Sequence, residues 1–296
     1  MRVVVTGQQG QVAQALVELG AERDCEIVAL GRPTLDLAAA PASIHGALAA
    51  AAPDVIVSAA AYTAVDKAES ERDDAFVVNA SGAESVASAA RSLGVPLIHL
   101  STDYVFDGTK PEPYVEQDKT GPRTVYGASK LAGEQRVMAA HPDSVVLRTA
   151  WVFSPFGTNF VRTMLRVAAD RDEVAVVADQ QGSPTGALDL ADAILTIATR
   201  LRANPDRALH GVFHLANAGS ASWADLADAV FSVSASVGGP SAAVRRIGTA
   251  DYPTPALRPA NSRLDCGLMT ERYGITLRPW REAVEPVVRR LLSATL

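Results

Sequence analysis

Two residues four positions apart, Tyr126 and Lys130 in the stretch YGASK, could transfer a proton together. Residues i and i+4 of a helix share one face, so the Lys ammonium can lie beneath the pocket into which the Tyr phenol points. Thr102 closes an apolar run that predicts a buried strand, and a strand end can bring its hydroxyl to the same pocket. Alone, however, a Tyr-x-x-x-Lys pair also arises by chance on solvated helices.

The chemistry requires these residue types. A phenol has an ordinary pKa of about 10 and is a poor acid or base at neutral pH unless its anion is stabilised. Lowering that pKa to about 7 requires about 4 kcal/mol, and a unit charge about 5 Å away contributes roughly 3 kcal/mol at an effective dielectric constant near 20. Lys130 and a cationic cofactor ring would suffice, while Thr102 polarises a carbonyl oxygen.

The amino terminus predicts a dinucleotide site that would position these groups. The run Arg2 to Val5 leads into the glycine-rich stretch TGQQGQVA and then an amphipathic segment, which gives a strand, a turn and a helix. Gly7 allows the tight turn, Gly10 lets the backbone approach a pyrophosphate, and Ala13 permits close helix packing. Free N–H groups at the helix start would bind the phosphates.

Further strands and helices alternate along the chain. Strands are predicted at 26–30, 54–59, 96–101 and 144–148, and helical spacing recurs between them, for example at 83–93. This predicts an α/β, Rossmann-type doubly wound parallel sheet. We expect residues 1–150, with returning segments at about 186–215, to form the dinucleotide-binding domain. Residues 151–185 and 216–296 would form a smaller interleaved substrate-binding domain, because insertions after strand ends commonly cover the ligand crevice.

Composition narrows the function. The chain of 296 residues, 48% hydrophobic and 20% charged, can bury a large core. No segment is long and apolar enough to span a bilayer and the first residues already form a core strand, so we expect a cytoplasmic protein without a membrane partner. The net charge of −6 argues against a nucleic-acid surface. Cys25 and Cys266 lack metal spacing and are expected to be reduced.

Several blocks in a fixed order carry a family resemblance. Besides the glycine-rich turn and YGASKLAGE, they are AAAYTAVDKAESE, LSTDYVFDG, LRTAWVFSPFGTNFVRTML, DQQGSPTGALDLA and RPANSRLD. Over nearly its whole length the chain resembles the dTDP-4-dehydrorhamnose reductases, which are extended short-chain dehydrogenases/reductases. The resemblance implies that NAD(P)H delivers hydride to C4 of a 4-keto-6-deoxy nucleotide sugar, yielding dTDP-L-rhamnose. It implies that Tyr126 donates the proton, Lys130 holds the nicotinamide ribose and lowers the phenol pKa, and Thr102 hydrogen-bonds the ketone.

The same resemblance implies a set of cofactor contacts. They are Gly7, Gly10, Gln11 and Val12 at the pyrophosphate, Asp36 and Leu37 near the adenine, and Ala60, Ala61, Tyr62 and Thr63 after the third strand. Arg32 stands where a carboxylate would bind a free ribose 2′-OH and could face a 2′-phosphate, or it could be solvated beside a turn. We expect NADPH, with NADH possible.

The family pattern implies a second set of residues for the substrate. They are Val65, Thr102, Asp103, Tyr126 and Trp151. Trp151 would give the sugar a flat apolar wall, although a Trp just past a strand is often a core residue. Asn159 and the segment 258–261 could meet the nucleotide diphosphate, since Arg has a bidentate fork, or Arg258 could only pin an irregular loop.

No metal ligands are predicted. His210 and His214 fall at an extended segment without a carboxylate partner nearby. Some relatives bind a divalent ion at a dimer interface through glutamates, and Leu188 stands where one of these would fall, so a monomer and a homodimer both stay open.

Two other functions are also open. Another nucleotide-sugar 4-ketoreductase would use the same residues, because the second domain reads the base and the sugar. A non-catalytic regulator, similar to the β subunit of methionine adenosyltransferase, would bind NADP without turnover. The intact set of Thr102, Tyr126 and Lys130 argues against the regulator.

Overall fold

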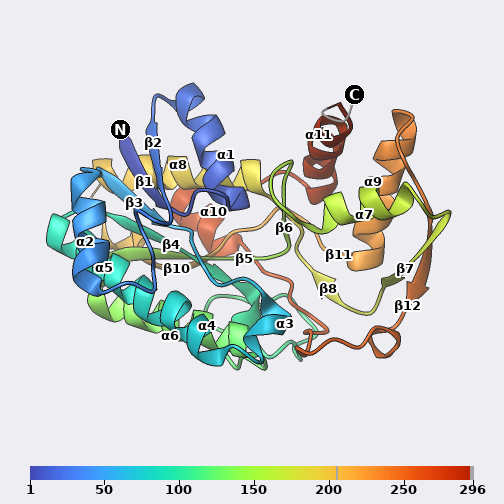
Figure 1. Ribbon diagram of the computed structural model, residues 1–296, viewed down its shortest axis with the longest axis horizontal. Helices are drawn as coiled ribbons and strands as arrows, with labels where there is room; N and C mark the ends of the chain where they lie inside the picture. The colour runs from blue at the N-terminus through green and yellow to red at the C-terminus, as the bar shows by residue number, and fades with distance from the viewer. Residues whose placement is uncertain (205, 294–296) are drawn as a thin grey trace.

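The computed structural model describes residues 1–204 and 206–293 and is built around a six-stranded sheet (Figure 1). The strand order is β10-β5-β4-β3-β1-β2, and all neighbours are parallel. The strands are β1 (Arg2–Thr6), β2 (Glu26–Leu30), β3 (Val55–Ser58), β4 (Leu97–Thr102), β5 (Ser144–Thr149) and β10 (Gly211–His214). The predicted Rossmann-type parallel sheet is confirmed.

Helices cover both faces of this sheet. One face carries α1 (Gln11–Gly20), α8 (Ala187–Ala203) and α10 (Gly267–Tyr273), and the other carries α2 (Pro41–Ala50), α5 (Ala83–Leu93) and α6 (Val125–Ala140). Leu16 and Ile194 are buried on the first face, and Ile44 and Val86 on the second. Because both faces are covered, the strands are nearly continuous apolar runs, which made them visible in the sequence.

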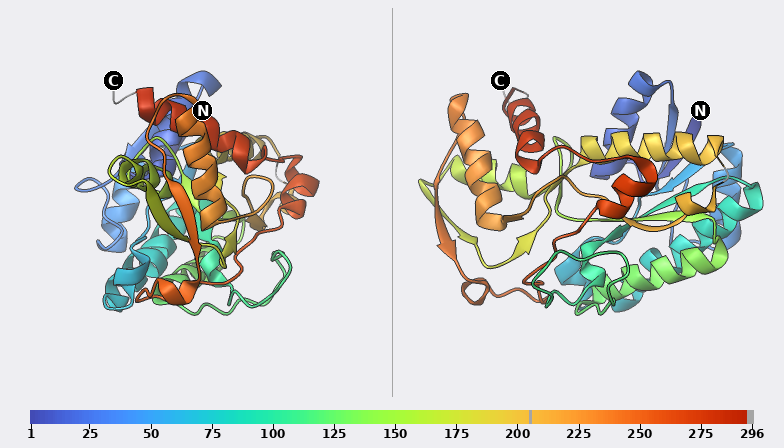
Figure 2. Two further views of the ribbon diagram at one scale, coloured as in Figure 1. Left: turned by 90° about the vertical axis from the view of Figure 1, so that its right-hand side faces the viewer. Right: turned by 180° about the vertical axis from the view of Figure 1, so that it is seen from behind.

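A smaller part lies beside the sheet, at the right of Figure 1 and the left of the rear view in Figure 2. It contains α7 (Phe160–Ala168), α9 (Trp223–Ser236), α11 (Trp280–Ser293) and the parallel pair β7 (Glu173–Val177) and β12 (Ala243–Ile247). Its own core includes Val161, Leu226 and Val284. Met269 and Tyr273 of α10, in contrast, pack into the core beneath the sheet.

Short elements make up most of the connections. They are η1 (Ala21–Arg23), α3 (Val65–Ala68), α4 (Arg72–Phe76), the π-helical turn η2 (Val77–Gly82), η3 (Asp103–Val105), β6 (Val152–Phe153), β8 (Gln181–Gly182), β9 (Thr185–Gly186), η4 (Arg207–Leu209), β11 (Ala221–Ser222) and η5 (Thr249–Asp251). Within the described ranges, no helix has both the length and the apolar character needed to cross a membrane.

Candidate active site

Helix α6 brings the predicted proton donor to the end of β4. The Thr124 hydroxyl caps the helix by accepting a hydrogen bond from Gly127 N at 3.0 Å. A Cβ atom at Gly127 would clash with the carbonyl oxygen of Tyr104, so this glycine lets the first turn of α6 pack directly on η3. The YGASK stretch, which carries the predicted proton donor, is therefore also a close helix contact.

Lys130 lies on the same helix face as Tyr126 and is buried. Its Nζ atom donates a hydrogen bond to the backbone carbonyl of Leu100 in β4 at 2.6 Å. Burial lowers the pKa of Lys130 to about 8, and the charge of Glu134 acts in the opposite direction. The ammonium is thus anchored to the sheet by one of its three donors, which leaves two for another ligand.

Tyr126 and Thr102 meet at this point. Burial raises the pKa of Tyr126, while the hydrogen bond with the Thr102 side chain acts against that rise. We expected Lys130 to lower the phenol pKa, but in the structure the burial of the ring is the largest influence and keeps the phenol protonated. The predicted trio is brought together, with a phenol that holds a proton to donate.

Asp103 directly follows Thr102 and is buried with it. The Thr102 hydroxyl donates to Asp103 Oδ1 at 2.9 Å and accepts from Tyr104 N at 3.2 Å. Burial raises the pKa of Asp103 to about 6, and its Oδ2 is a buried oxygen without a hydrogen-bond partner in the described structure. The hydrogen bonds of the Thr102 and Ser262 side chains act against this rise, so the carboxyl group is held beside the predicted trio.

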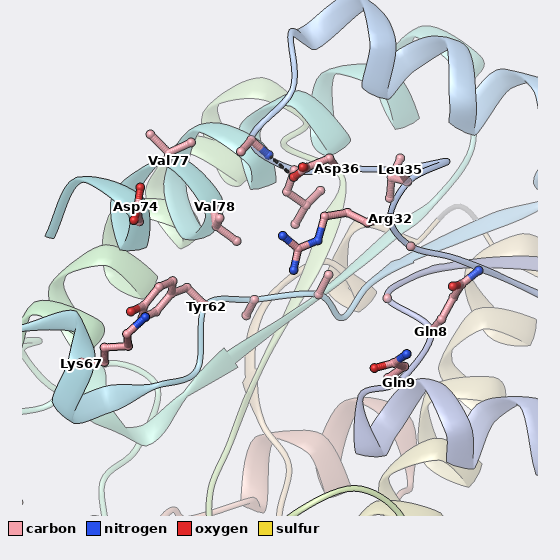
Figure 3. Close-up of a pocket in the computed structure, with 16 residues that line it drawn as sticks. Gln8, Gln9, Arg32, Leu35, Asp36, Tyr62, Lys67, Asp74, Val77 and Val78 are labelled. Atoms are coloured by element: carbon pink, nitrogen blue, oxygen red, sulfur yellow. Dashed lines mark hydrogen bonds between the residues drawn. The ribbon is translucent and has the colours of Figure 1, made fainter. Parts of the chain in front are cut away.

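A cleft with a volume of about 740 Å³ opens at the carboxyl ends of β1, β2 and β3 (Figure 3). The chain proceeds to opposite sides of β1 here, which is where doubly wound sheets bind dinucleotides. Gly7 adopts a φ of 97° in the turn, and Gly10 is the N-cap of α1. The predicted residues that line the cleft are Gly7, Arg32, Asp36, Leu37, Ala60, Ala61 and Tyr62.

The donors and shape of this cleft fit a dinucleotide. In Figure 3 the Arg32 side chain points into the cleft, with Gln8 and Gln9 on the glycine-rich turn and Lys67 across from them. Asp36 accepts a hydrogen bond from Ala38 N at 2.9 Å, so part of its carboxylate holds its own loop. A cationic side chain is thus placed where a 2′-phosphate could be bound.

Gln11 has a second role that the sequence did not reveal. Its Nε2 donates to the Val152 carbonyl at 3.1 Å, and its Oε1 accepts from Ser154 at 2.8 Å and from Asn159 at 3.0 Å. The side chain therefore joins the glycine-rich turn to the start of the smaller part. Gly10 and Val12 flank it at the start of α1, so the backbone N–H groups there remain the expected phosphate donors.

Asn159 does not lie as expected for a diphosphate contact. Its Oδ1 caps α7 by accepting from Arg162 N at 3.1 Å, and its Nδ2 donates to the carbonyls of Ser154 and Phe156 as well as to Gln11. The side chain is buried and its polar atoms are all used within the protein. Capping explains this residue.

Asn79 was missed as a member of the site. It accepts a hydrogen bond from Tyr62 N at 2.8 Å and donates to the Tyr62 carbonyl at 3.0 Å and to Ser129 at 2.9 Å. It thereby fastens the loop that carries Ala61 and Thr63 to α6. The residue lies in the π-helical turn η2, a distortion that hydrophobic periodicity does not reveal.

Trp151 occupies the boundary between the sheet and the smaller part. Its ring stacks on that of Trp223, with centroids 3.6 Å apart and planes 7° from parallel. Trp151 has a φ of 47°, a left-handed conformation that is uncommon and strained for a bulky residue. The sequence predicted a single aromatic ring at this position, whereas in the structure Trp151 forms a stacked pair with Trp223.

Arg258 pins an irregular loop across the site. Its Nη2 lies 2.6 Å from Asp66 Oδ2, and Nη1 donates to the Tyr104 hydroxyl at 3.3 Å. A pocket of about 260 Å³ lies between this loop and Tyr104. Val65, at the start of α3 beside Asp66, is partly buried. These contacts fit the loop-pinning alternative for Arg258, and a contact with the diphosphate stays a prediction. Asn261 donates to the Lys110 and Glu112 carbonyls.

Histidine at the sheet edge is structural. His214 lies in β10 and is buried, with Nδ1 3.1 Å from the carbonyls of Tyr114 and Asp265. Burial lowers its pKa to about 3. Among the described residues, no group of three or more His, Cys, Asp or Glu side chains is arranged to hold a metal ion.

Comparison with known proteins identifies the family. The family model described as the RmlD substrate binding domain matches residues 1–293. The dTDP-4-dehydrorhamnose reductase of Sinorhizobium fredii is 53% identical over 292 residues, covering 99% of this chain and 98% of that protein. The chain belongs to the dTDP-4-dehydrorhamnose reductase family.

Two further members of the comparison bear on the ligands. The crystal structure of a Bacillus anthracis dTDP-4-dehydrorhamnose reductase in complex with NADP has a TM-score of 0.89 and 36% identity, covering 98% of this chain and 99% of that one. A probable dTDP-4,6-dihydroxy-2-methyloxan-3-one 4-ketoreductase of Streptomyces antibioticus is 40% identical, covering 99% of this chain and 97% of that protein. The family resemblance inferred from the sequence is confirmed, and with it the assignment as an oxidoreductase.

Proposed function

We propose that this chain reduces the C4 ketone of dTDP-4-dehydro-L-rhamnose to dTDP-L-rhamnose with NADPH. The observation that carries the proposal is the meeting of Thr102, Tyr126 and Lys130 at the carboxyl end of β4, beside a cleft shaped for a dinucleotide. A bound NADPH supplies hydride to the ketone carbon, and NADH is a possible second donor.

The protein groups supply the proton and the positioning. Tyr126, kept protonated by burial, donates its proton to the ketone oxygen as that oxygen becomes an alcohol. The Thr102 hydroxyl stabilises negative charge on the same oxygen during the transfer. Lys130 holds the nicotinamide ribose with the donors that Leu100 leaves free, and its charge favours the phenolate that proton donation produces.

Binding roles follow from the two sides of the crevice. The residues proposed for the cofactor are Gly7, Gly10, Gln11, Val12, Arg32, Asp36, Leu37, Ala60, Ala61, Tyr62 and Thr63. The residues proposed for the sugar are Val65, Asp103 and Trp151 in addition to the catalytic trio. The supporting facts are the burial of Asp103 beside Thr102 and the stacked, partly buried Trp151 and Trp223 rings next to the sheet.

The direct test is an assay of the purified chain with dTDP-4-dehydro-L-rhamnose and NADPH. We expect the loss of NADPH absorbance to match the dTDP-L-rhamnose formed, with the configuration at C4 assigned by NMR. Binding of NADPH without any turnover of this sugar would reject the proposed substrate. Failure to bind either nicotinamide cofactor would reject the cleft assignment.

The alternative function is the reduction of a different dTDP-linked 4-keto sugar. The Streptomyces antibioticus relative is named for a different 4-keto sugar at 40% identity. A panel of dTDP-linked 4-keto sugars, compared by kcat/KM, separates the two, because the substrate with the highest value is the one that the site discriminates for.

Assembly, location and domain limits complete the proposal. We place the reaction in the cytoplasm, where NADPH and nucleotide sugars are made, and assign no membrane or nucleic-acid partner. The chain acts as a monomer or a homodimer, which light scattering of the eluted protein distinguishes. Residues 1–150 with about 186–215 bind the dinucleotide, and 151–185 with 216–296 bind the sugar nucleotide, except that α10 packs into the core beneath the sheet.

A further inference from the structure

A buried ion pair lies behind the catalytic residues. Glu134 and Arg148 are 3% and 4% exposed, and their side chains form two hydrogen bonds: Nε to Oε1 at 2.9 Å and Nη2 to Oε2 at 2.7 Å. The Ser101 hydroxyl donates a third hydrogen bond to Glu134 Oε1 at 2.5 Å. The proposed reaction uses none of these groups directly. Burying two charged side chains nevertheless has a large desolvation cost, even when their hydrogen bonds are all formed.

The position of Glu134 connects this pair to the reaction. Tyr126, Lys130 and Glu134 follow one another at intervals of four residues, so they lie along one face of α6. Each of them has a hydrogen-bond partner in β4. The Leu100 carbonyl binds Lys130, Ser101 binds Glu134, and Thr102 binds Tyr126. Three consecutive residues of β4 thus form hydrogen bonds with three side chains on one face of α6.

Arg148 fixes the carboxylate from the neighbouring strand. It is opposite Ser101 in the register of β4 and β5, and its guanidinium lies 5.1 Å from the centre of the Phe106 ring. Both oxygens of Glu134 therefore accept hydrogen bonds from strand residues, which fix the carboxylate one helical turn from Lys130.

We propose that Glu134 is a positioning residue for the reduction, which holds Lys130 in its charged form and in place beneath Tyr126. Residues four apart on a helix are about 5 to 6 Å from each other, close enough for a carboxylate to stabilise a buried ammonium. This inference rests on the proposed function, because it assigns Glu134 to the Lys130 that holds the nicotinamide ribose.

Other charged groups near Lys130 do not replace Glu134. His99 of β4 has its pKa held well below its usual range by burial, and the Lys130 charge lowers it further, so this imidazole is neutral. Tyr126 is a protonated phenol and Arg148 is a cation already paired with Glu134. Asp103, which follows β4, is hydrogen-bonded to Thr102. Glu134 is the carboxylate that acts on the Lys130 pKa and opposes the effect of burial.

The test measures the dissociation constant of NADPH from pH 5.5 to pH 10 by fluorescence, so that it needs no sugar substrate. In the native protein we expect binding to weaken as Lys130 loses its proton near pH 8. In Glu134→Gln the midpoint should fall by about one pH unit, and the dissociation constant at pH 8 should rise several-fold, up to about tenfold. Glu134→Asp, which keeps the charge, should restore the native midpoint.

Matched variants separate this role from a structural one. Glu84→Gln removes the same charge from an exposed pair with Arg136 and should leave the midpoint unchanged. If Glu134→Gln alone does not fold because it strands the Arg148 charge, Glu134→Gln/Arg148→Gln leaves no buried charge unpaired and is measured instead. A folded variant with the native midpoint would overturn the inference. Normal NADPH titrations with no sugar turnover would reject the proposed function and leave this result standing.

Discussion

Arg258 and Asp66 form an ion pair at 2.6 Å that joins the irregular loop of the smaller part to the start of α3, 192 residues away in sequence. The Ala256 N–H donates to the other oxygen of Asp66 at 3.1 Å. The loop is thus held by one carboxylate at two points, directly above the Tyr104 side of the site. A substitution of either partner should therefore weaken binding of the sugar nucleotide more than it lowers the stability of the fold.

This pair yields a prediction about substrate binding. Arg258→Ala should raise the KM for the sugar nucleotide about tenfold or more, with a loss of stability under about 1 kcal/mol because Asp66 is 41% exposed. Asp66→Asn tests the reason. If Arg258 only pins the loop, both variants have equal KM values, whereas a phosphate contact makes Arg258→Ala the worse of the two. Arg245→Ala, in an exposed pair with Glu173, is the control for charge loss.

Replacement of the proton donor should separate chemistry from binding. Tyr126→Phe removes one hydroxyl and keeps the ring, so we expect an unchanged fold and NADPH affinity while kcat falls by a factor on the order of 10² or more. Steady-state kinetics with a parallel NADPH titration checks both. Turnover close to that of the native protein would remove Tyr126 from the role of acid.

The sheet and much of the site could be predicted because their signals are local. β2 and α5 begin and end at the predicted residues, since a buried apolar run and a helix ended by Gly94 are visible in sequence. The trio could be predicted because Thr102 ends a strand and because Tyr126 and Lys130 are four residues apart on one helix. These features need no knowledge of what packs against them.

Other features depend on contacts between distant segments. Gln11 binding to the Val152 carbonyl and Trp151 stacking on Trp223 join residues whose proximity no spacing encodes. The same holds for Asn159, whose polar type suggested a ligand contact but whose position at the start of α7 makes it a cap. Glu134 was overlooked because a Glu on a helix is ordinarily solvated, and its burial follows from Arg148 on another strand.

Arg32 provides a prediction about the choice of cofactor. Its side chain points into the cleft (Figure 3), where it would face the 2′-phosphate that distinguishes NADPH from NADH. Arg32→Ala should raise the KM for NADPH about tenfold or more and leave the KM for NADH nearly unchanged. Kinetics with both cofactors checks this. Equal effects on the two would refute a 2′-phosphate contact, and Arg91→Ala on α5 is a control for the lost charge.

Asp103 leads to a prediction about the pH dependence of stability. Its folded-state pKa is raised by burial to about 6, above the ordinary value of 3.8. Between these two values the native state binds more protons than the unfolded state, so the free energy of unfolding contributed by this group decreases as the pH rises from about 4 to about 6. The loss is complete about one pH unit above the folded-state pKa.

Asp103→Asn should therefore stabilise the protein at pH 7 and leave its stability at pH 4 nearly unchanged. The expected gain is on the order of 2 to 3 kcal/mol, because each pKa unit corresponds to about 1.4 kcal/mol and the Asn carbonyl can still accept the Thr102 hydrogen bond. Urea unfolding at both pH values measures it. Asp107→Asn is the matched control with the opposite sign, because the Thr109 N–H lowers the pKa of Asp107 and its ionised form stabilises the fold at neutral pH. A gain of equal size at pH 4 and pH 7 would show that burial of the ionised carboxylate is not the cause.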